Sequence, residues 1–245
     1  AKWGIEHADR FARVIAPSSG ARAKYEQSGF QDADMAVLPY FCELAPAETP
    51  RPLPDPPTIT YLGRIAANKG HEYFIEALGK LPSSVQGRMV GSISADVADT
   101  LRVLASKHGC AERLDLHGWA SRDEVVDLLD RTSVFVFPSL WPETLGIVGL
   151  EALSRGVPVV ASDLGGVPEW CREDSTGYRV PPKDGAAIAA RVERLLADDD
   201  RLRAFGARGI SLIKERFRPA QHIDRLLRLY QHAQTSHQSA SSSRA

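Results

Sequence analysis

The 245-residue chain has only three cysteines, and they are widely spaced: Cys42, Cys110 and Cys171. Cysteines that are few, odd in number and distant fit neither a disulfide framework nor a thiolate metal site, and they indicate a reducing compartment. No apolar run approaches the roughly 20 residues that a membrane-spanning helix needs. The opening residues also lack the pattern of a signal peptide. The sequence therefore predicts a cytoplasmic protein.

The chain also lacks an excess of either charge, because 30 lysines and arginines nearly balance 31 aspartates and glutamates. This balance argues against bulk binding to nucleic acid. The sequence does not start with methionine, so we expect the chain to begin partway through a longer protein. With 43% hydrophobic residues, it is long enough for one large or two small domains with a real core.

From residue 58 onward, short apolar runs of strand length alternate with segments of helical periodicity. This alternation predicts an α/β fold with a doubly wound parallel sheet. Strands are expected at residues 58–61, 86–91, 114–116, 134–137 and 157–161, and a hairpin-like piece at 177–180. Helices are expected at residues 72–80, 97–107, 123–130, 147–155 and 186–197, followed by two more that end near residue 233.

The flanking segments have a different composition. Residues 13–16 and 36–40 read as short strands on either side of a helix at 18–27. Residues 46–57 contain six prolines, and because proline favours an extended backbone we expect a semi-stiff linker there. The last twelve residues, 234–245, are poor in apolar side chains, so they are expected to form a disordered tail.

Two glutamates with seven residues between them, Glu143 and Glu151, are the most informative feature. They lie between the expected strands 134–137 and 157–161, in a strand–helix–strand unit whose strands should be parallel. The loop after the first strand then lies at the carboxyl edge of the sheet, where open α/β folds bind ligands. Gly146 permits close backbone approach, and the helix after it offers free N–H groups to an anion. A carboxylate such as Glu151, one turn into that helix, suits a ribose diol.

A second group of candidates follows the first strand of the main domain. Gly63 ends this strand, and Arg64 and Lys69 come next, with Lys69 expected at the start of a helix. A cation in a first helical turn opposes the helix dipole at a cost of about 0.3–1 kcal/mol, which an anionic ligand would offset. Since two cations and a helix N-terminus converge on one edge of the sheet, the pattern predicts a diphosphate site.

Three segments carry a family resemblance: GRIAANKG, PSLWPETLGIVGLEALSRGVPVVASDLGGVPEW and GYRVPPKDGAAIAARVERLL. They resemble the donor-binding, Rossmann-like C-terminal half of a retaining glycosyltransferase of family 4, which has the GT-B architecture. The resemblance runs from residue 59 to residue 217, within an expected donor-binding domain at 58–218 and a C-terminal helix at 219–233. Leu145 departs from the family, which usually has an aromatic residue there. Residues 1–45 resemble the end of the family's N-terminal domain, whose acceptor-binding bulk is not in this chain.

The resemblance implies transfer of a hexose from a nucleotide-diphosphate sugar to an acceptor hydroxyl, with retention of configuration and without a metal or another cofactor. Arg64 and Lys69 would hold the diphosphate and stabilise charge on the departing phosphate in place of a metal. Glu143 would contact the transferred sugar near the reacting centre. The triplet Asp32-Ala33-Asp34, which matches the metal motif of other glycosyltransferases, is interpreted as solvated turn residues.

The resemblance also implies which residues bind the rest of the donor. The backbone of residues 144–147 would hold the distal phosphate, Glu151 the ribose, and the turns after two further strands the nucleoside. The full set of expected donor-binding residues is Gly63, Gly91, Gly118, Trp119, Thr144, Leu145, Gly146, Ile147 and Glu151. The partners expected are the nucleotide-sugar donor and a glycan, lipid or small-molecule acceptor, without nucleic acid. A peripheral contact with the inner membrane face could be made by the missing domain.

Two other functions stay open on the sequence. A GT-B-like epimerase acting on nucleotide sugars would share the fold and the leaving diphosphate. A non-catalytic nucleotide-sugar-binding module would share the fold alone, although such a module has no need of Arg64, Lys69, Glu143 and Glu151 together. The nucleobase, the sugar and the acceptor are also left open by these residues.

Overall fold

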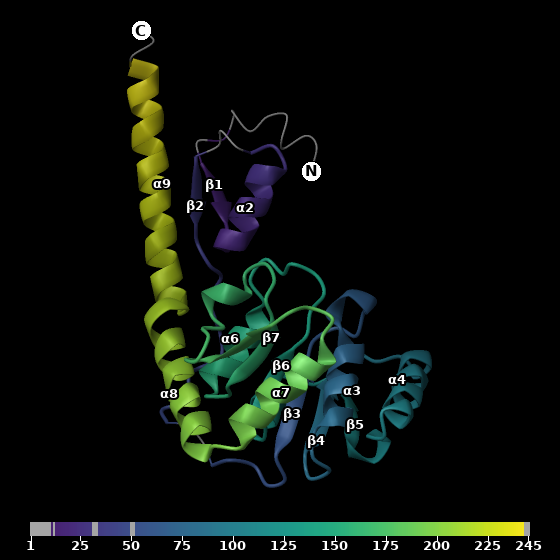
Figure 1. The fold of residues 1–245 in the computed structure, drawn as a ribbon. Coiled ribbons are helices and arrows are strands. Elements are labelled where there is room, and N and C mark those ends of the chain that lie inside the picture. Colours follow the sequence, from purple (N-terminus) through teal and green to yellow (C-terminus); the bar gives the residue numbers. More distant parts are fainter. Residues whose placement is uncertain (1–10, 12, 31–33, 50–51, 243–245) are drawn as a thin grey trace.

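A computed structural model describes residues 11, 13–30, 34–49 and 52–242 of the chain, with side chains up to residue 234. Within these residues, one six-stranded parallel sheet is covered by helices, and a small N-terminal segment packs beside it (Figure 1). A long C-terminal helix rises past the sheet alongside that segment. The predicted α/β class with a parallel sheet is confirmed.

The six strands are β3 (Thr58–Leu62), β4 (Gln86–Val90), β5 (Leu114–Gly118), β6 (Val134–Phe137), β7 (Val159–Ser162) and β8 (Gly177–Val180). Their order across the sheet is β5-β4-β3-β6-β7-β8, and every neighbouring pair is parallel. The strand order reverses between β3 and β6, and such a switch point is where open α/β sheets bind ligands. The expected hairpin-like piece at 177–180 is wrong, because β8 pairs with β7 in parallel.

The helices of this domain are α3 (His71–Lys80), α4 (Ala95–Lys107), α5 (Arg122–Asp130), α6 (Ile147–Ser154), α7 (Gly185–Leu196) and α8 (Asp199–Arg216). Short 3₁₀ turns are η2 (Ala67–Lys69), η3 (Ala111–Arg113) and η4 (Val167–Glu169). The buried side chains form two clusters. The first includes residues of α3, α4, α7 and the start of α8, and the second includes residues of α5, α6 and the later part of α8.

Strand β6 shows why the sheet needs both layers. Its residues Val134 and Val136 belong to the first cluster, and Phe135 and Phe137 belong to the second. Successive side chains of a strand point to opposite faces, so a continuously apolar strand is buried only when helices cover both faces. The continuous apolar run of β6 thus fits the doubly wound sheet that the alternation of strands and helices predicts.

The N-terminal segment consists of β1 (Val14–Ala16), α2 (Ser19–Gln27) and β2 (Met35–Val37), and its two strands are parallel. It packs directly on the loop that follows β7. The backbone N–H and the hydroxyl of Ser19 both donate to Glu169, at 2.9 and 2.7 Å. A Cβ added to Gly20 would lie 2.2 Å from the carbonyl oxygen of Gly165. This contact therefore requires glycine in α2.

The final helix, α9, is longer than predicted and spans Pro219–Ser242. The sequence predicts a helix to residue 233 and a disordered tail, whereas α9 continues through nine more residues that include neither glycine nor proline. Arg225 of α9 donates to the carbonyl of Val37. The ring nitrogen Nδ1 of His222 lies 2.8 Å from the carbonyl oxygen of Pro39. None of the described helices combines the length and apolarity needed to cross a membrane.

Candidate functional site

A cavity of about 300 Å³ opens at the switch point of the sheet, at the carboxyl ends of β3 and β6. Seven of the predicted site residues line it: Gly63, Arg64, Lys69, Glu143, Thr144, Gly146 and Ile147. Tyr40, which follows β2, and Tyr61 of β3 line it as well. The structure thus brings together most of the residues that the sequence places at this edge.

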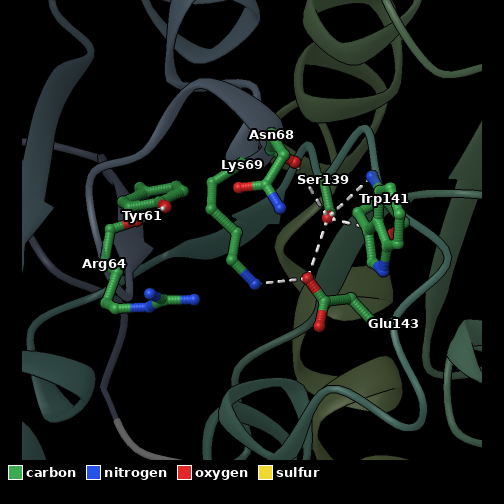
Figure 2. Close-up of polar contacts among 7 residues, drawn as sticks. All are labelled: Tyr61, Arg64, Asn68, Lys69, Ser139, Trp141 and Glu143. Atoms are coloured by element: carbon green, nitrogen blue, oxygen red, sulfur yellow. Dashed lines mark hydrogen bonds and ion pairs between the residues drawn. The ribbon is translucent and has the colours of Figure 1, made fainter. Parts of the chain in front are cut away.

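Lys69 and Glu143 form an ion pair inside the cavity (Figure 2). The Lys69 ammonium donates to Oε1 of Glu143, and the hydroxyl of Ser139 donates to the same oxygen at 3.0 Å. The side chains of Lys69 and Glu143 are 19% and 18% exposed, so the pair is reachable from the cavity but largely desolvated. The predicted cation and the predicted carboxylate are therefore each other's partner in this structure.

The position of Lys69 differs from the prediction in one respect. It ends the 3₁₀ turn η2, and Gly70, in the left-handed region with φ 68°, is the N-cap of the helix that follows. Lys69 consequently lies outside α3, and the helix-dipole argument for its anionic ligand does not apply. The argument that remains is the convergence of charge on the cavity.

Arg64 and Lys69 extend side by side into the space in front of Glu143 (Figure 2). The hydroxyl of Tyr61 donates to the carbonyl of Arg64 at 2.7 Å, which fixes the backbone where β3 ends. Burial, with the charge of Glu143 in addition, raises the pKa of Tyr61, so this hydroxyl stays a donor at neutral pH. Among the described residues Arg64 makes no ion pair, which leaves its guanidinium available to an anionic ligand.

Three glycines end the neighbouring strands β3, β4 and β5. Gly63, Gly91 and Gly118 all have positive φ, at 146°, 155° and 83°. The N–H of Gly91 donates to the carbonyl of Gly118, and a Cβ on Gly91 would lie 2.0 Å from the carbonyl oxygen of Gly63. Gly91, Gly118 and the 73% exposed Trp119 lie beyond the cavity lining, on the side of β5. These three expected donor-binding residues therefore lie outside this cavity.

Leu145, an expected donor-binding residue, is absent from the cavity lining. Its side chain is fully buried in the cluster under α6, and its carbonyl accepts a hydrogen bond from Nε1 of Trp170 at 2.6 Å. Gly146, the N-cap of α6, has φ 86° and lines the cavity. At Leu145, therefore, only the backbone can serve a ligand, and the departure from the family's aromatic residue affects packing.

Glu151, the expected ribose-binding residue, is also absent from the cavity lining. It is half-buried on α6, and its surroundings include Cys42 and the ion pair between Arg122 and Glu43. Burial raises the pKa of Glu151, the Arg122 charge opposes that shift, and the Glu43 charge adds to it. Of the two glutamates, only Glu143 lines this cavity.

The backbone of the Glu143 loop is fixed by a glycine pair after β7. The N–H of Gly166 donates to the carbonyl of Glu143 at 2.8 Å. A Cβ on Gly165 would lie 2.2 Å from that carbonyl oxygen, and one on Gly166 would lie 2.5 Å from the carbonyl oxygen of Thr144. Both glycines therefore permit this close packing of two loops.

A larger cavity of about 540 Å³ lies outside this site, at the amino ends of β3, β4 and β5, and two of its arginines have partners within the chain. Arg113 donates there to the carbonyls of Leu78 and Val85, and Arg88 pairs with Asp115. In the described part of the chain, no group of three or more histidine, cysteine, aspartate or glutamate side chains is placed to hold a metal ion.

The residues that the sequence reasoning missed are Tyr40, Tyr61 and Ser139. Tyr40 comes from the N-terminal segment, and no local pattern connects it to a cavity built on the sheet. Ser139 was visible only as part of the Pro-Ser pair after β6, a common residue type in any loop.

A parallel sheet of this strand order, with a charged cavity at its switch point, defines a Rossmann-like domain of the nucleotide-binding kind. The family model described as "Glycosyl transferases group 1" matches residues 48–212, which is more than half of the chain. The chain belongs to this family.

The chain is similar to several proteins of known name. It is 37% identical over 154 residues to the alpha-D-kanosaminyltransferase of Streptomyces kanamyceticus, a match that covers 62% of this chain and 39% of that protein. Its fold matches sucrose-phosphate synthase from Thermosynechococcus elongatus with a TM-score of 0.80 and 26% identity, covering 91% and 59% of the two chains.

The fold also matches Anabaena HepE in complex with UDP, with a TM-score of 0.84, 20% identity and coverage of 94% and 67%. At that identity the likeness concerns the fold alone. The chain spans less than half the length of the curated relatives it matches.

Proposed function

We propose that this chain supplies the donor-binding half of a retaining glycosyltransferase of family 4. The enzyme would move a sugar from a nucleotide-diphosphate sugar to an acceptor hydroxyl without a metal ion. The observation that carries the proposal is the convergence of Arg64, Lys69 and Glu143 on one cavity at the switch point of the sheet. Membership of the glycosyl transferases group 1 family supports it.

In this proposal the diphosphate lies between the two cations and the N-terminus of α6. Arg64 and Lys69 contact it from β3 and η2, and backbone N–H groups of residues 144–147 face it from the opposite side. The reaction barrier is set by negative charge that develops on the leaving diphosphate. Fixed cations and helix-end dipoles stabilise such charge without reorganising, as a metal ion does in other enzymes.

The sugar and the nucleoside take opposite ends of the site. Glu143, which has Oε1 bound to Lys69 and Ser139, contacts the transferred sugar. Glu151 accepts hydrogen bonds from the ribose. The base lies against Gly91, Gly118 and Trp119. The acceptor hydroxyl attacks from the face that the diphosphate leaves, so the configuration at the sugar carbon is retained.

The proposal is tested by titrating the 245-residue chain with uridine, guanosine and adenosine diphosphates while following its thermal unfolding. A ligand that binds only the folded chain at 100 times its Kd stabilises it by about 2.7 kcal/mol. We expect one of the three to do so, and we expect the chain without its acceptor half to transfer little or no sugar. If none of them raises the unfolding temperature, the proposed site is wrong. Robust sugar transfer by these residues alone would contradict the donor-half assignment.

The product formed by the longer protein separates transfer from epimerisation. A sugar covalently attached to an acceptor supports the proposal. A nucleotide sugar released with one inverted carbon, and no glycosylated acceptor, would indicate the epimerase instead.

The affinity for a nucleoside diphosphate should depend on pH through Glu151. Burial raises the pKa of this carboxyl above its ordinary value of 4.5, and only the ionised form accepts both ribose hydroxyl groups. The affinity should be full above the raised pKa and should decline as the pH falls through it, earlier than for an exposed glutamate. Calorimetric titration at a series of pH values measures this decline.

Glu151→Gln and inorganic pyrophosphate are the matched controls for this prediction. The variant should lose most of the decline because its amide does not titrate in that range. Pyrophosphate, which has no ribose, should bind wild type and variant with the same pH profile. An unchanged decline in the variant would show that Glu151 is not the titrating group.

A further inference from the structure

Ser139 lies outside the cavity lining and contacts Glu143, which belongs to it. It is the second residue after β6 and is 2% exposed. Its Oγ lies 3.0 Å from Oε1 of Glu143, 3.2 Å from the carbonyl oxygen of Trp141 and 3.5 Å from that of Asn68 (Figure 2). The N–H of Trp141 donates to the same Oγ at 3.3 Å.

The hydroxyl has one proton and three acceptors in reach, so the acceptors compete. The carboxylate is both the nearest and the only charged acceptor of the three, and charge-assisted hydrogen bonds are about twice as strong as neutral ones. The hydroxyl proton of Ser139 therefore goes to Glu143. The N–H of Trp141 satisfies a lone pair of Oγ and fixes the direction of that proton.

Glu143 is held asymmetrically. Among the described residues, its hydrogen bonds from Lys69 and from Ser139 both reach Oε1, which leaves Oε2 open. The proposed diphosphate needs the ammonium of Lys69, so donor binding draws this cation away from the carboxylate. Ser139 then becomes the contact that keeps Glu143 in place.

The two loops that carry these residues are bound tightly to each other. The N–H of Leu140 donates to the carbonyl of Asn68 at 3.0 Å. A Cβ on Gly70 would lie 2.0 Å from the carbonyl oxygen of Pro138, so the backbones touch there. Ser139 and Lys69 consequently keep a fixed spacing while the ammonium changes partner.

From this geometry we infer that Ser139 is a positioning residue, which orients Glu143 toward the transferred sugar while Lys69 is engaged by the diphosphate. The inference rests on the proposed function and deepens it. Ser139 acts on Glu143 after the donor is bound. Replacing Ser139 should therefore lower turnover and leave the affinity for the nucleoside diphosphate unchanged.

The test compares Ser139→Ala with Ser133→Ala in the full-length protein that contains this chain. Ser133 lies at the opposite end of β6, is 3% exposed, and its Oγ also accepts a backbone N–H, that of Thr58 at 3.0 Å. Both variants remove one buried hydroxyl and should lower the unfolding temperature similarly. Only Ser139→Ala should lower kcat, by about 10- to 100-fold because a reacting group is misplaced, with the Kd for the nucleoside diphosphate unchanged.

Two further variants separate positioning from general damage. Ser139→Thr keeps the hydroxyl and should recover most of the lost kcat. On a Glu143→Ala background, Ser139→Ala should cost nothing more, because its target is gone. If Ser139→Ala fails to fold, Ser139→Cys fills the same space with a weak donor and should show the same loss of kcat.

The inference is overturned if Ser139→Ala keeps wild-type kcat, if Ser133→Ala loses as much, or if the losses of Ser139→Ala and Glu143→Ala multiply. Those outcomes leave the proposed function intact as long as the wild type binds a nucleoside diphosphate. A wild type that binds none overturns the proposed function and this inference with it.

Discussion

Replacing Lys69 with alanine should lower the turnover number of the proposed transferase by a factor of about 10² to 10³, the usual cost of removing one preorganised group from a developing negative charge. Lys69 lies at the wall of the cavity, and its ammonium already bonds a carboxylate there. In the donor complex the same ammonium would face the leaving diphosphate. Without it, the charge on that group has one fewer fixed cation to stabilise it. Steady-state kinetics of the full-length protein measures the loss.

Folding should be much less affected than turnover by this change. Glu143 keeps its hydrogen bond from Ser139 and can be hydrated from the open cavity. Lys80→Ala is the matched control, since Lys80 ends α3, the helix that follows Lys69 and Gly70, and pairs with Glu76 at 3.8 Å on a half-exposed surface. The control should retain both activity and stability. Normal turnover in Lys69→Ala would refute the diphosphate assignment.

Gly91→Ala should lower the free energy of unfolding by about 2 to 5 kcal/mol, through backbone strain and overpacking together. Gly91 has φ 155°, a conformation that residues with a side chain rarely adopt. Its new methyl group would lie 2.0 Å from the carbonyl oxygen of Gly63, a backbone atom of the neighbouring strand. The end of β3 at Gly63 or the end of β4 at Gly91 must therefore move, and Gly63 lines the cavity.

Gly109→Ala separates the strain from the collision. Gly109 also has a positive φ, 67°, but a Cβ there meets nothing within 4 Å. Only the strain of a left-handed residue remains, which costs about 1 to 2 kcal/mol. Chemical denaturation should therefore give a lower free energy of unfolding for Gly91→Ala than for Gly109→Ala. Equal free energies of unfolding in the two variants would mean that the backbone contact between Gly91 and Gly63 relaxes without cost, contrary to the packing described above.

The parts of the site that the sequence predicted are those in which a residue's place in the chain fixes its place in space. Gly63, Arg64 and Lys69 follow one strand, and Glu143 and Gly146 follow another. In a parallel sheet the carboxyl ends of strands share one edge, so these residues had to meet. The alternation of short apolar runs with helical segments, which predicts the doubly wound sheet, can likewise be recognised from short stretches of sequence.

The errors lie where tertiary packing decides the outcome. Whether residues 177–180 turn back as a hairpin or cross to pair in parallel with β7 depends on the path of the preceding loop and not on the apolar pattern. The surroundings of Leu145 and Glu151 are also set by tertiary packing, since Leu145 is buried in the core and Glu151 lies near Glu43 and Arg122. Ser139 gains its importance from Asn68 and Glu143, which belong to different loops.

The chain passes twice between the N-terminal segment and the six-stranded sheet, and the two crossings are bonded to each other. The N–H of Cys42 donates to the carbonyl of Phe217, and Arg218 donates to the carbonyls of Cys42 and Leu44. These bonds hold the two crossings together beside the sheet. Tyr40, two residues before Cys42, lines the cavity. One wall of the cavity is therefore carried by a residue outside the sheet, so a change at this junction would act on the site without altering any residue of the sheet itself.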